Sequence, residues 1–308
     1  MMKLNLKSKI TTIICKWIIV FLFGTGSLLS AQLDTLVIPS VAMSKNPKAV
    51  VVLPDVYPKS NDRFPVVYLL HGWSGSYRDW PTKMDLKPLA DKYGFIIVCP
   101  DGGYAGWYVN SPIVKDSQYE TYIAKEVVDF IDANFRSVAD STGRFLCGLS
   151  MGGHGAFTLL AKFPERFAGA GCMSGAMTMS SGERRAGLTD ILGDWETNQQ
   201  RWEANSALFL AERLVGHDKA ILIDCGVDDF LHQTNFLLHK KLLDLKIPHV
   251  YIERPGAHTW DYWTNALEYH LLFFRNNFYK DAKCEIKFHS KPEQSVPKPP
   301  TFWQNWLP

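Results

Sequence analysis

Short apolar segments alternate with amphipathic segments along most of the chain. Seven runs are rich in β-branched and aromatic residues, and several of them are apolar at nearly every position, which is typical of strands buried on both faces of a parallel sheet. These predicted strands are Val50–Leu53, Val66–Leu70, Phe95–Cys99, Arg144–Cys147, Ala168–Met173, Ala220–Cys225 and His249–Glu253. Because helical patterns separate them, the sequence predicts an α/β fold, with a mostly parallel central sheet and helices on both faces.

The clearest helical pattern between the strands spans residues 118–135, where apolar residues recur every three or four positions. Ser117 and Glu120 have the spacing of a capping box at its start, so we expect Glu120 to cap the helix rather than take part in chemistry. In folds of this kind the active site lies at the carboxyl ends of the strands. The loops that follow strands are therefore the places to search for functional residues.

The first 31 residues have the organisation of a secretion signal. Four lysines precede the apolar run Trp17–Phe23, and small residues follow it. The run is well short of the ~20 residues that a membrane-spanning helix needs. We expect a signal peptide over residues 1–31, cleaved after Ala31, and hence a periplasmic or extracellular protein. An uncleaved membrane anchor is the alternative interpretation.

Two later segments interrupt the alternation of strands and helices. Residues 176–218, which include Arg184, Arg185, Trp195 and Trp202, are predicted to form a small cap insertion over the site. Residues 285–308 contain five prolines and four aromatic residues, a composition that favours extended chain. The catalytic domain is therefore predicted to span residues 32–284.

Composition and charge exclude several classes of function. The 308 residues are 46% hydrophobic and 21% charged, as in an ordinary globular protein. Removing the signal segment takes away four lysines and no acid, which changes the net charge from +2 to about −2. A nearly neutral chain without a basic run indicates no nucleic-acid partner. We also expect no membrane association after signal cleavage.

Five cysteines remain beyond the predicted signal, and four of them lie in apolar, strand-like runs. Their odd number and irregular spacing are not typical of a disulfide framework. Cys99, Cys147, Cys172 and Cys225 are predicted to pack as small core residues, while Cys284 follows the last helical pattern. No pair has the spacing of zinc ligands, so the sequence predicts no metal site.

A G-x-S-x-G motif, residues 148–152, lies between the strand that starts at Arg144 and a predicted helix. A serine on such a sharp strand-to-helix turn adopts strained backbone angles, and its hydroxyl stands clear of the sheet. The small flanking glycines prevent collisions at this turn. Ser150 is therefore the predicted nucleophile.

A serine hydroxyl needs a general base. In the α/β-hydrolase fold, which the motif at Ser150 indicates, the acid and then the histidine base follow the serine on later loops. Asp228 and Asp229 follow the predicted strand Ala220–Cys225, and His258 follows the predicted strand His249–Glu253. Either aspartate is suitably placed from the sequence alone, whereas Asp224 lies inside its strand. His71 comes too early in the chain to be the base, so we interpret it as a residue that shapes its loop.

The tetrahedral intermediate of acyl transfer also needs preorganised hydrogen-bond donors for its oxyanion. The backbone N–H of Met151 lies at the positive end of the helix that follows Ser150. The second donor is expected from the loop after Val66–Leu70, where Gly72 allows close approach and the N–H of Trp73 is the candidate.

Several motifs together resemble those of the esterase D-type family. They are Leu53-Pro54-x-x-Tyr57, Pro65-Val66-Val67-Tyr68-Leu69-Leu70-His71-Gly72, Pro100-Asp101-Gly102, Gly148-Leu149-Ser150-Met151-Gly152-Gly153, Cys225-Gly226-x-x-Asp229 and Pro255-Gly256-x-His258-x-Trp260. That family includes tributyrin-type carboxylesterases, feruloyl esterases, S-formylglutathione hydrolases and antigen 85-type mycolyltransferases. The resemblance covers about residues 48–278. It implies Asp229 as the acid, Trp73 and Met151 as oxyanion donors, and no cofactor.

Aromatic residues are concentrated in the loops predicted to surround the site. These candidate substrate-binding residues are Tyr104, Trp107, Tyr108, Trp260 and Trp263. Flat aromatic faces suit sugar rings and hydroxycinnamoyl groups, so we expect short-chain or aromatic acyl esters of carbohydrates, such as feruloyl or acetyl esters. Acyl transfer to a carbohydrate acceptor and a catalytically silent, sugar-binding hydrolase fold are the alternatives.

Overall fold

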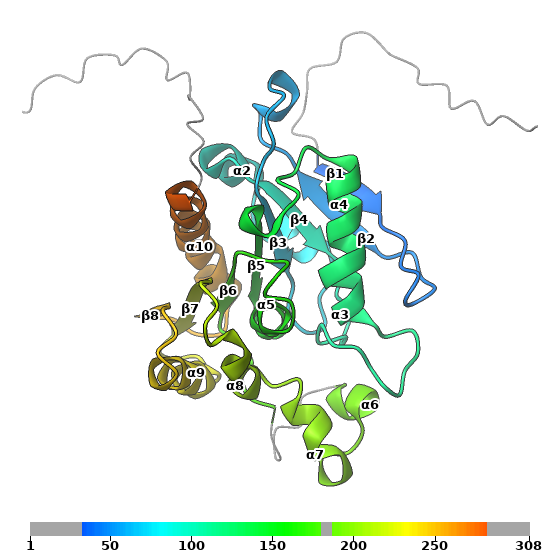
Figure 1. Cartoon of the computed structure of the whole chain (residues 1–308), viewed down its shortest axis with the longest axis vertical. Helices are drawn as coiled ribbons and strands as arrows, with labels where there is room; N and C mark the ends of the chain where they lie inside the picture. Colours follow the sequence, from blue (N-terminus) through cyan, green and yellow to red (C-terminus); the bar gives the residue numbers. More distant parts are fainter. Residues whose placement is uncertain (1–32, 180–186, 282–308) are drawn as a thin grey trace, which may run out of the picture. The chain divides into compact units, whose positions relative to one another are not determined.

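The structure, a computed structural model, describes residues 33–179 and 187–281 (Figure 1). The predicted signal segment, Arg184 and Arg185, Cys284 and the predicted tail lie outside the described residues. Within the described residues, no helix is long and apolar enough to cross a membrane.

An eight-stranded sheet organises the described part of the chain, with the order β1-β2-β4-β3-β5-β6-β7-β8 (Figure 1). Its strands are β1 (Leu33–Val37), β2 (Lys48–Val52), β3 (Val66–Leu70), β4 (Ile96–Pro100), β5 (Arg144–Leu149), β6 (Gly169–Met173), β7 (Ala220–Gly226) and β8 (Val250–Arg254). Only β1 with β2 and β2 with β4 pair in antiparallel fashion among the described strands. The mostly parallel α/β-hydrolase sheet predicted from the sequence is confirmed.

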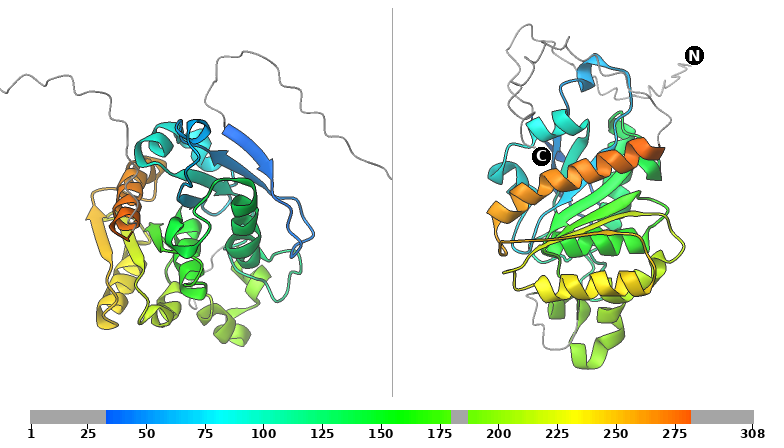
Figure 2. Two further views of the ribbon diagram at one scale, coloured as in Figure 1. Left: turned by 45° about the horizontal axis from the view of Figure 1, so that its top comes forward. Right: turned by 90° about the vertical axis from the view of Figure 1, so that its left-hand side faces the viewer.

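Helices cover both faces of this sheet (Figures 1 and 2). They are α1 (Asp79–Lys83), α2 (Lys87–Tyr93), α3 (Tyr119–Thr121), α4 (Val128–Asn134), α5 (Met151–Lys162), α6 (Leu188–Leu192), α7 (Trp195–Glu203), α8 (Ala207–Leu210), α9 (His232–Asp244) and α10 (Trp260–Asp281), with single turns η1 (Tyr57–Lys59), η3 (Ser141–Gly143) and η4 (Ala211–Leu214) and the π-helical η2 (Tyr122–Val127). Alternate residues of each strand point to opposite faces. Two buried clusters result, one beneath α5 and the other beneath α2 and α10.

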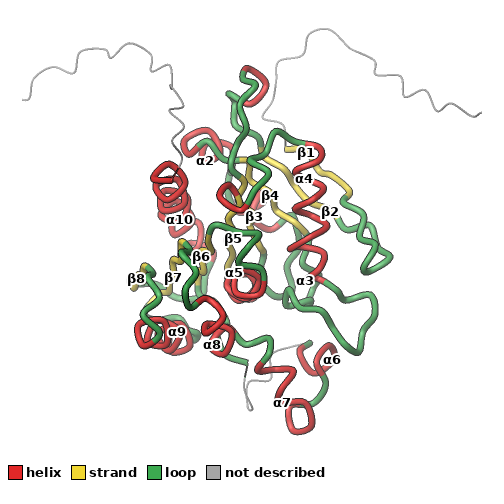
Figure 3. Tube along the Cα trace, in the orientation of Figure 1, coloured by secondary structure: helices red, strands yellow, loops and turns green. Residues whose placement is uncertain are grey.

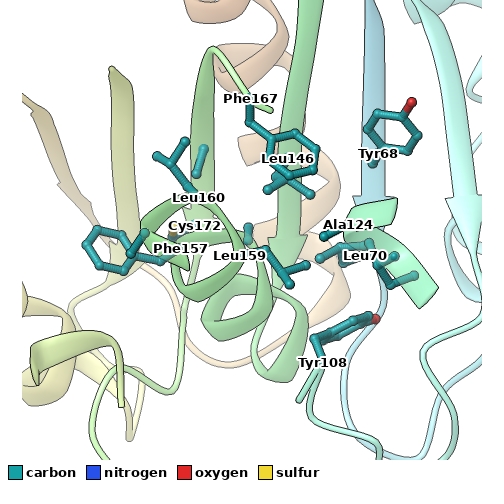
Figure 4. Close-up of a cluster of buried hydrophobic side chains, with 14 of the residues drawn as sticks. Tyr68, Leu70, Tyr108, Ala124, Leu146, Phe157, Leu159, Leu160, Phe167 and Cys172 are labelled. Atoms are coloured by element: carbon teal, nitrogen blue, oxygen red, sulfur yellow. The ribbon is translucent and has the colours of Figure 1, made fainter. Parts of the chain in front are cut away.

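The first cluster joins the central strands to α5. Tyr68 and Leu146 on the sheet belong to the same buried cluster as Leu159 and Leu160 of α5, and all four side chains are essentially inaccessible to solvent (Figure 4). Dense apolar packing of this kind fixes the helix relative to the sheet, and with it the turn from which the helix starts. Cys99, Cys147, Cys172 and Cys225 are buried and unpaired, as expected for small core residues.

The predicted helix over residues 118–135 is present as α3, η2 and α4 in succession, with a π-helical middle. The predicted capping box is wrong, because the helix start has no side-chain cap. Glu120 instead pairs with Lys162 of α5, and both side chains are largely buried. A buried ammonium needs an anionic partner more than the half-buried first turn needs a cap.

The segment between β6 and β7 holds the short helices α6, α7 and α8 (Figure 3). His154 of α5 donates a hydrogen bond from Nε2 to the Asn205 carbonyl at 2.7 Å. Lys162 donates to the Asn205 side chain at 2.6 Å. The described part of this insertion is thereby tied to α5, the helix that follows Ser150.

Candidate active site

Ser150 occupies the turn between β5 and α5 and has φ 53° and ψ −115°, a strained conformation for a residue with a side chain. Its N–H donates to the Met173 carbonyl at 2.9 Å, which ties the turn to β6. A side chain at Gly152 would collide with the Leu70 and His71 carbonyls. Glycine is therefore required there for the turn to pack against β3.

His258 lies in the loop between β8 and α10 and connects two of the predicted residues. Its Nε2 is 3.0 Å from the Ser150 hydroxyl, and its Nδ1 is 2.8 Å from Oδ2 of Asp229. Because an ionised carboxylate can only accept, Nδ1 donates to Asp229 and leaves Nε2 to accept from the hydroxyl. This arrangement allows the imidazole to remove the Ser150 proton.

Asp229 follows β7 and is buried at the base of the site. Burial alone would raise its pKa, but hydrogen bonds from His258, the Leu231 N–H and Ser174 outweigh it and lower the pKa of Asp229. The Leu231 N–H is 2.7 Å from Oδ1. Asp228, the alternative from the sequence, is exposed to solvent, and His258 donates its hydrogen bonds to the neighbouring Asp229.

Main-chain hydrogen bonds hold the two loops that carry Asp229 and His258 side by side. The Val227 N–H donates to the Arg254 carbonyl at 3.0 Å, and the Asp228 N–H donates to the Gly256 carbonyl at 2.9 Å. A side chain at Gly226 would collide with the Gly256 carbonyl. The close approach of the loops fixes the distance between the carboxylate and the imidazole.

Two aromatic rings lie against the imidazole of His258. Trp263 meets it edge to face at 4.8 Å, is only 6% exposed, and donates from Nε1 to the Ser174 hydroxyl at 3.0 Å. Phe230 lies 4.5 Å away on an open side and is 74% exposed. Phe230 is absent from the predicted site residues, although an aromatic residue directly after the candidate acid is a usable signal.

The loop after β3 approaches Ser150 closely, since a Cβ built on Gly72 would lie 3.6 Å from the Ser150 Cβ. The backbone N–H groups of Trp73 and Met151 form no hydrogen bond within the described residues. Both are available to an oxyanion at this turn.

His71 fixes the conformation of that loop. It donates from Nδ1 to the Gly72 carbonyl and accepts from the Gly102 N–H at Nε2, both at 2.8 Å. Burial lowers the pKa of His71, which favours the neutral imidazole that this pattern requires. The contacts agree with the interpretation of His71 as a loop-shaping residue.

Tyr104 and Trp73 form an exposed aromatic pair beside this loop. Their rings meet edge to face at 5.3 Å, and Tyr104 is 64% exposed. The Ser74 N–H donates to the Tyr104 carbonyl at 2.7 Å, which joins the two loops. Of the predicted substrate-binding residues, Tyr104 is the most accessible.

Trp107 and Tyr108 are turned inward, and the prediction that they line an open site needs correction. Trp107 is 4% exposed, and Tyr108 is completely buried beside α5 (Figure 4). The Tyr108 hydroxyl donates to the His71 carbonyl at 3.0 Å. Both residues have positive φ, 51° and 57°, a local twist that an amphipathic pattern does not reveal.

Trp260 and Trp263 also differ from the prediction, since neither is an open aromatic wall. Trp260 packs edge to face on Trp80 at 5.2 Å, with the Lys83 ammonium over its ring, and Trp263 is buried behind His258. Within residues 33–179 and 187–281, no group of three or more His, Cys, Asp or Glu residues is arranged to hold a metal ion.

Comparison with known proteins adds an independent line of evidence. Residues 40–274 match the protein family described as "Putative esterase". An esterase of Mycobacterium tuberculosis strain H37Rv is 32% identical over 247 residues, which cover 70% of this chain and 53% of the relative. The chain thus spans about half the length of that relative.

Two further similarities extend across nearly the whole length of the other protein. An acetyl esterase of Caldicellulosiruptor saccharolyticus is 26% identical over 259 residues, covering 75% of this chain and 94% of that protein. A solved structure of a ferulic acid esterase superposes with a TM-score of 0.70 and 26% identity, covering 80% of this chain and 98% of the other.

Proposed function

The chain belongs to the esterase family that its motifs resemble, and we propose that it is an exported serine carboxylesterase acting on carbohydrate esters. The acyl groups are short-chain or aromatic, such as acetyl or feruloyl. The observation that carries the proposal is the continuous hydrogen-bonded series from Asp229 through His258 to Ser150. No metal or cofactor enters the proposed reaction.

In the proposed reaction, His258 Nε2 takes the hydroxyl proton while Ser150 Oγ attacks the ester carbonyl carbon. The resulting oxyanion accepts from the N–H groups of Trp73 and Met151. His258 then returns its proton to the alcohol oxygen, the C–O bond breaks, and the acyl group stays on Ser150. Asp229 stabilises the imidazolium that exists between these two proton transfers.

Water completes the cycle by attacking the acyl-enzyme, again with His258 as general base, and releases a carboxylic acid. A sugar hydroxyl that enters in place of water would give acyl transfer, which is the alternative reaction of the same intermediate. The order of charged, apolar and small residues over 1–31 supports export, and that segment lies outside the described residues.

The substrate class is supported by two observations. Exposed aromatic side chains offer flat apolar faces near the candidate triad: Trp73, on the loop after β3, pairs with Tyr104, and Phe230 packs against His258. The related proteins described as an acetyl esterase and a ferulic acid esterase take their names from the two acyl classes proposed here.

A panel of esters and a serine-directed label test the proposal together. We expect an organophosphonate to modify wild type at Ser150, and Ser150→Ala to lose both the label and about 10⁵-fold or more of its activity on methyl ferulate and p-nitrophenyl acetate. The fully buried Ser174 is the internal control, which we expect to stay unlabelled. Mass spectrometry of peptides locates the label.

Four outcomes would contradict the proposal in different ways. Full activity in Ser150→Ala rejects the nucleophile, and absence of both label and turnover indicates a silent binding protein. A preference for S-formylglutathione or for long acyl chains by about tenfold rejects the substrate class. An acylated sugar, formed in place of the free acid when saccharide is added, identifies a transferase.

A further inference from the structure

Phe230 is exposed, although a large apolar side chain is more favourable when buried. It is 74% exposed, yet its ring centroid lies only 4.5 Å from that of His258, at an interplanar angle of 50°. The residues before and after it are both buried: Asp229 accepts from the Leu231 N–H, and the Leu231 side chain is inside the core. The ring is therefore held in place at the open side of the imidazole.

The chemistry of the reaction determines which part of a substrate meets this ring. His258 Nε2 must donate its proton to the oxygen of the departing alcohol, so the alcohol lies on the imidazole side of Ser150. The oxyanion points instead toward the N–H groups of Trp73 and Met151, on the loop after β3 and the start of α5. A ring packed against the imidazole thus borders the alcohol and not the oxyanion.

We propose that Phe230, together with Asp228, forms the subsite for the alcohol, and that the alcohol is a sugar whose C–H face stacks on the Phe230 ring. This inference rests on the proposed esterase function. Asp228 is exposed two residues before Phe230, and its N–H bond to the Gly256 carbonyl fixes its backbone. Its carboxylate accepts sugar hydroxyl hydrogens, while the ring covers the apolar face of the sugar.

The alternative is that Phe230 only shields and positions His258, and the two roles predict different kinetics. If the ring only shields and positions His258, its removal lowers the rate for every ester by the same factor, because each reaction uses the same imidazole. If the ring contacts the alcohol, its removal affects saccharide esters more than methyl esters of the same acid. The ratio of kcat/KM between matched esters separates the two roles.

The experiment uses the full-length protein and two matched pairs of substrates. The feruloyl pair is 5-O-feruloyl-arabinose and methyl ferulate, and the acetyl pair is acetylated xylose and methyl acetate. Phe230→Ala and Phe230→Leu remove the flat face, whereas Phe230→Trp keeps it. Phe236→Ala is the control, because Phe236 is an exposed phenylalanine of α9 that packs near His239, not near His258.

We expect Phe230→Ala and Phe230→Leu to lower the saccharide-to-methyl ratio of kcat/KM about five- to tenfold, mainly through KM. Phe230→Trp should restore the ratio, and Phe236→Ala should leave it at the wild-type value. A ratio that stays constant while both rates fall, with an altered pH profile, overturns the subsite and makes Phe230 a positioning residue.

Two wild-type results would also overturn the subsite, and they separate its failure from that of the proposed function. An enzyme that cleaves the methyl esters at least as well as both saccharide esters remains an esterase but has no sugar subsite. An enzyme that cleaves none of the four esters fails the proposed function itself.

Discussion

Two aspartate–histidine pairs lie close together near the end of β7, and they differ in almost every respect other than composition. In the first, Asp229 and His258 are hydrogen-bonded, and the second imidazole nitrogen reaches Ser150. In the second, His270 Nε2 is 3.9 Å from Asp224 Oδ2, too far for a hydrogen bond. His270 is fully buried, and neither of its ring nitrogens has a hydrogen-bond partner within the described residues.

Other partners occupy the carboxylate of the second pair. Asp224 accepts from Arg254 at 3.0 Å and from the Tyr262 hydroxyl. The Arg254 guanidinium also lies over the rings of Tyr262 and Tyr269, at 4.6 and 4.8 Å. This network attaches α10 to β7 and β8, the strands from which the Asp229 and His258 loops start. One pair is therefore arranged for proton transfer and the other for packing.

Replacing the aspartate of each pair by asparagine should give the largest difference between the two pairs. We expect Asp229→Asn to lower kcat on methyl ferulate by about 10³- to 10⁴-fold with little loss of stability, because the amide favours the wrong imidazole tautomer. Asp224→Asn should instead lower the free energy of unfolding by about 3 kcal/mol, because it leaves the Arg254 charge without its carboxylate. Steady-state kinetics and urea denaturation measure the two effects. The reverse assignment would mean that the buried pair supports the chemistry.

His270 should make the free energy of unfolding depend on pH. Burial and the nearby Arg254 charge lower the pKa of His270 to about 3, so the native state holds it neutral. In the unfolded chain a histidine takes up a proton below about pH 6.5. Between these values only the unfolded state gains the proton, so His270 lowers the stability as the pH falls.

His270→Leu removes this titrating group and keeps an apolar side chain of similar size in the core. From pH 7 to pH 5, the unfolding free energy of wild type should therefore fall about 2 kcal/mol further than that of the variant. Urea unfolding at both pH values, with equal denaturant slopes for both proteins, checks the difference. Parallel losses in the two proteins would show that His270 is not the responsible group.

The sequence predicted the parts of this molecule that depend on local pattern and chain order. The seven predicted strands lie within two residues of the observed bounds, because most of these runs are apolar and buried. The edge strand β1, with a polar Asp34 and Thr35, is absent from the prediction. Ser150 is predicted from its G-x-S-x-G motif and His258 from the order of the strand-end loops, whereas only the family resemblance selects Asp229 over Asp228. The structure brings the three residues within hydrogen-bond distance. Their catalytic roles stay a prediction.

Features that depend on tertiary contacts could not be read in the same way. Tyr108 looked like a site residue because it follows a strand end, but two successive positive φ angles turn it into the core. The burial of Trp263 and the exposure of Phe230 beside the same imidazole depend on how α10 and the Asp229 loop meet. Aromatic residues near a site therefore need three-dimensional contacts before a role can be assigned.

The smallest effect is expected for Asp228, the carboxylate that belongs to neither pair. Asp228→Asn keeps the backbone N–H that binds the Gly256 carbonyl, so the loop geometry should persist. We expect methyl ferulate hydrolysis to change less than about threefold, because the His258 tautomer is set by Asp229. For 5-O-feruloyl-arabinose, KM should rise about two- to fivefold, since an amide accepts fewer hydroxyl hydrogens than a carboxylate. If Asp228→Asn lowers the rate of methyl ferulate hydrolysis as much as Asp229→Asn does, the triad acid is Asp228, and the two aspartate–histidine pairs no longer differ as described.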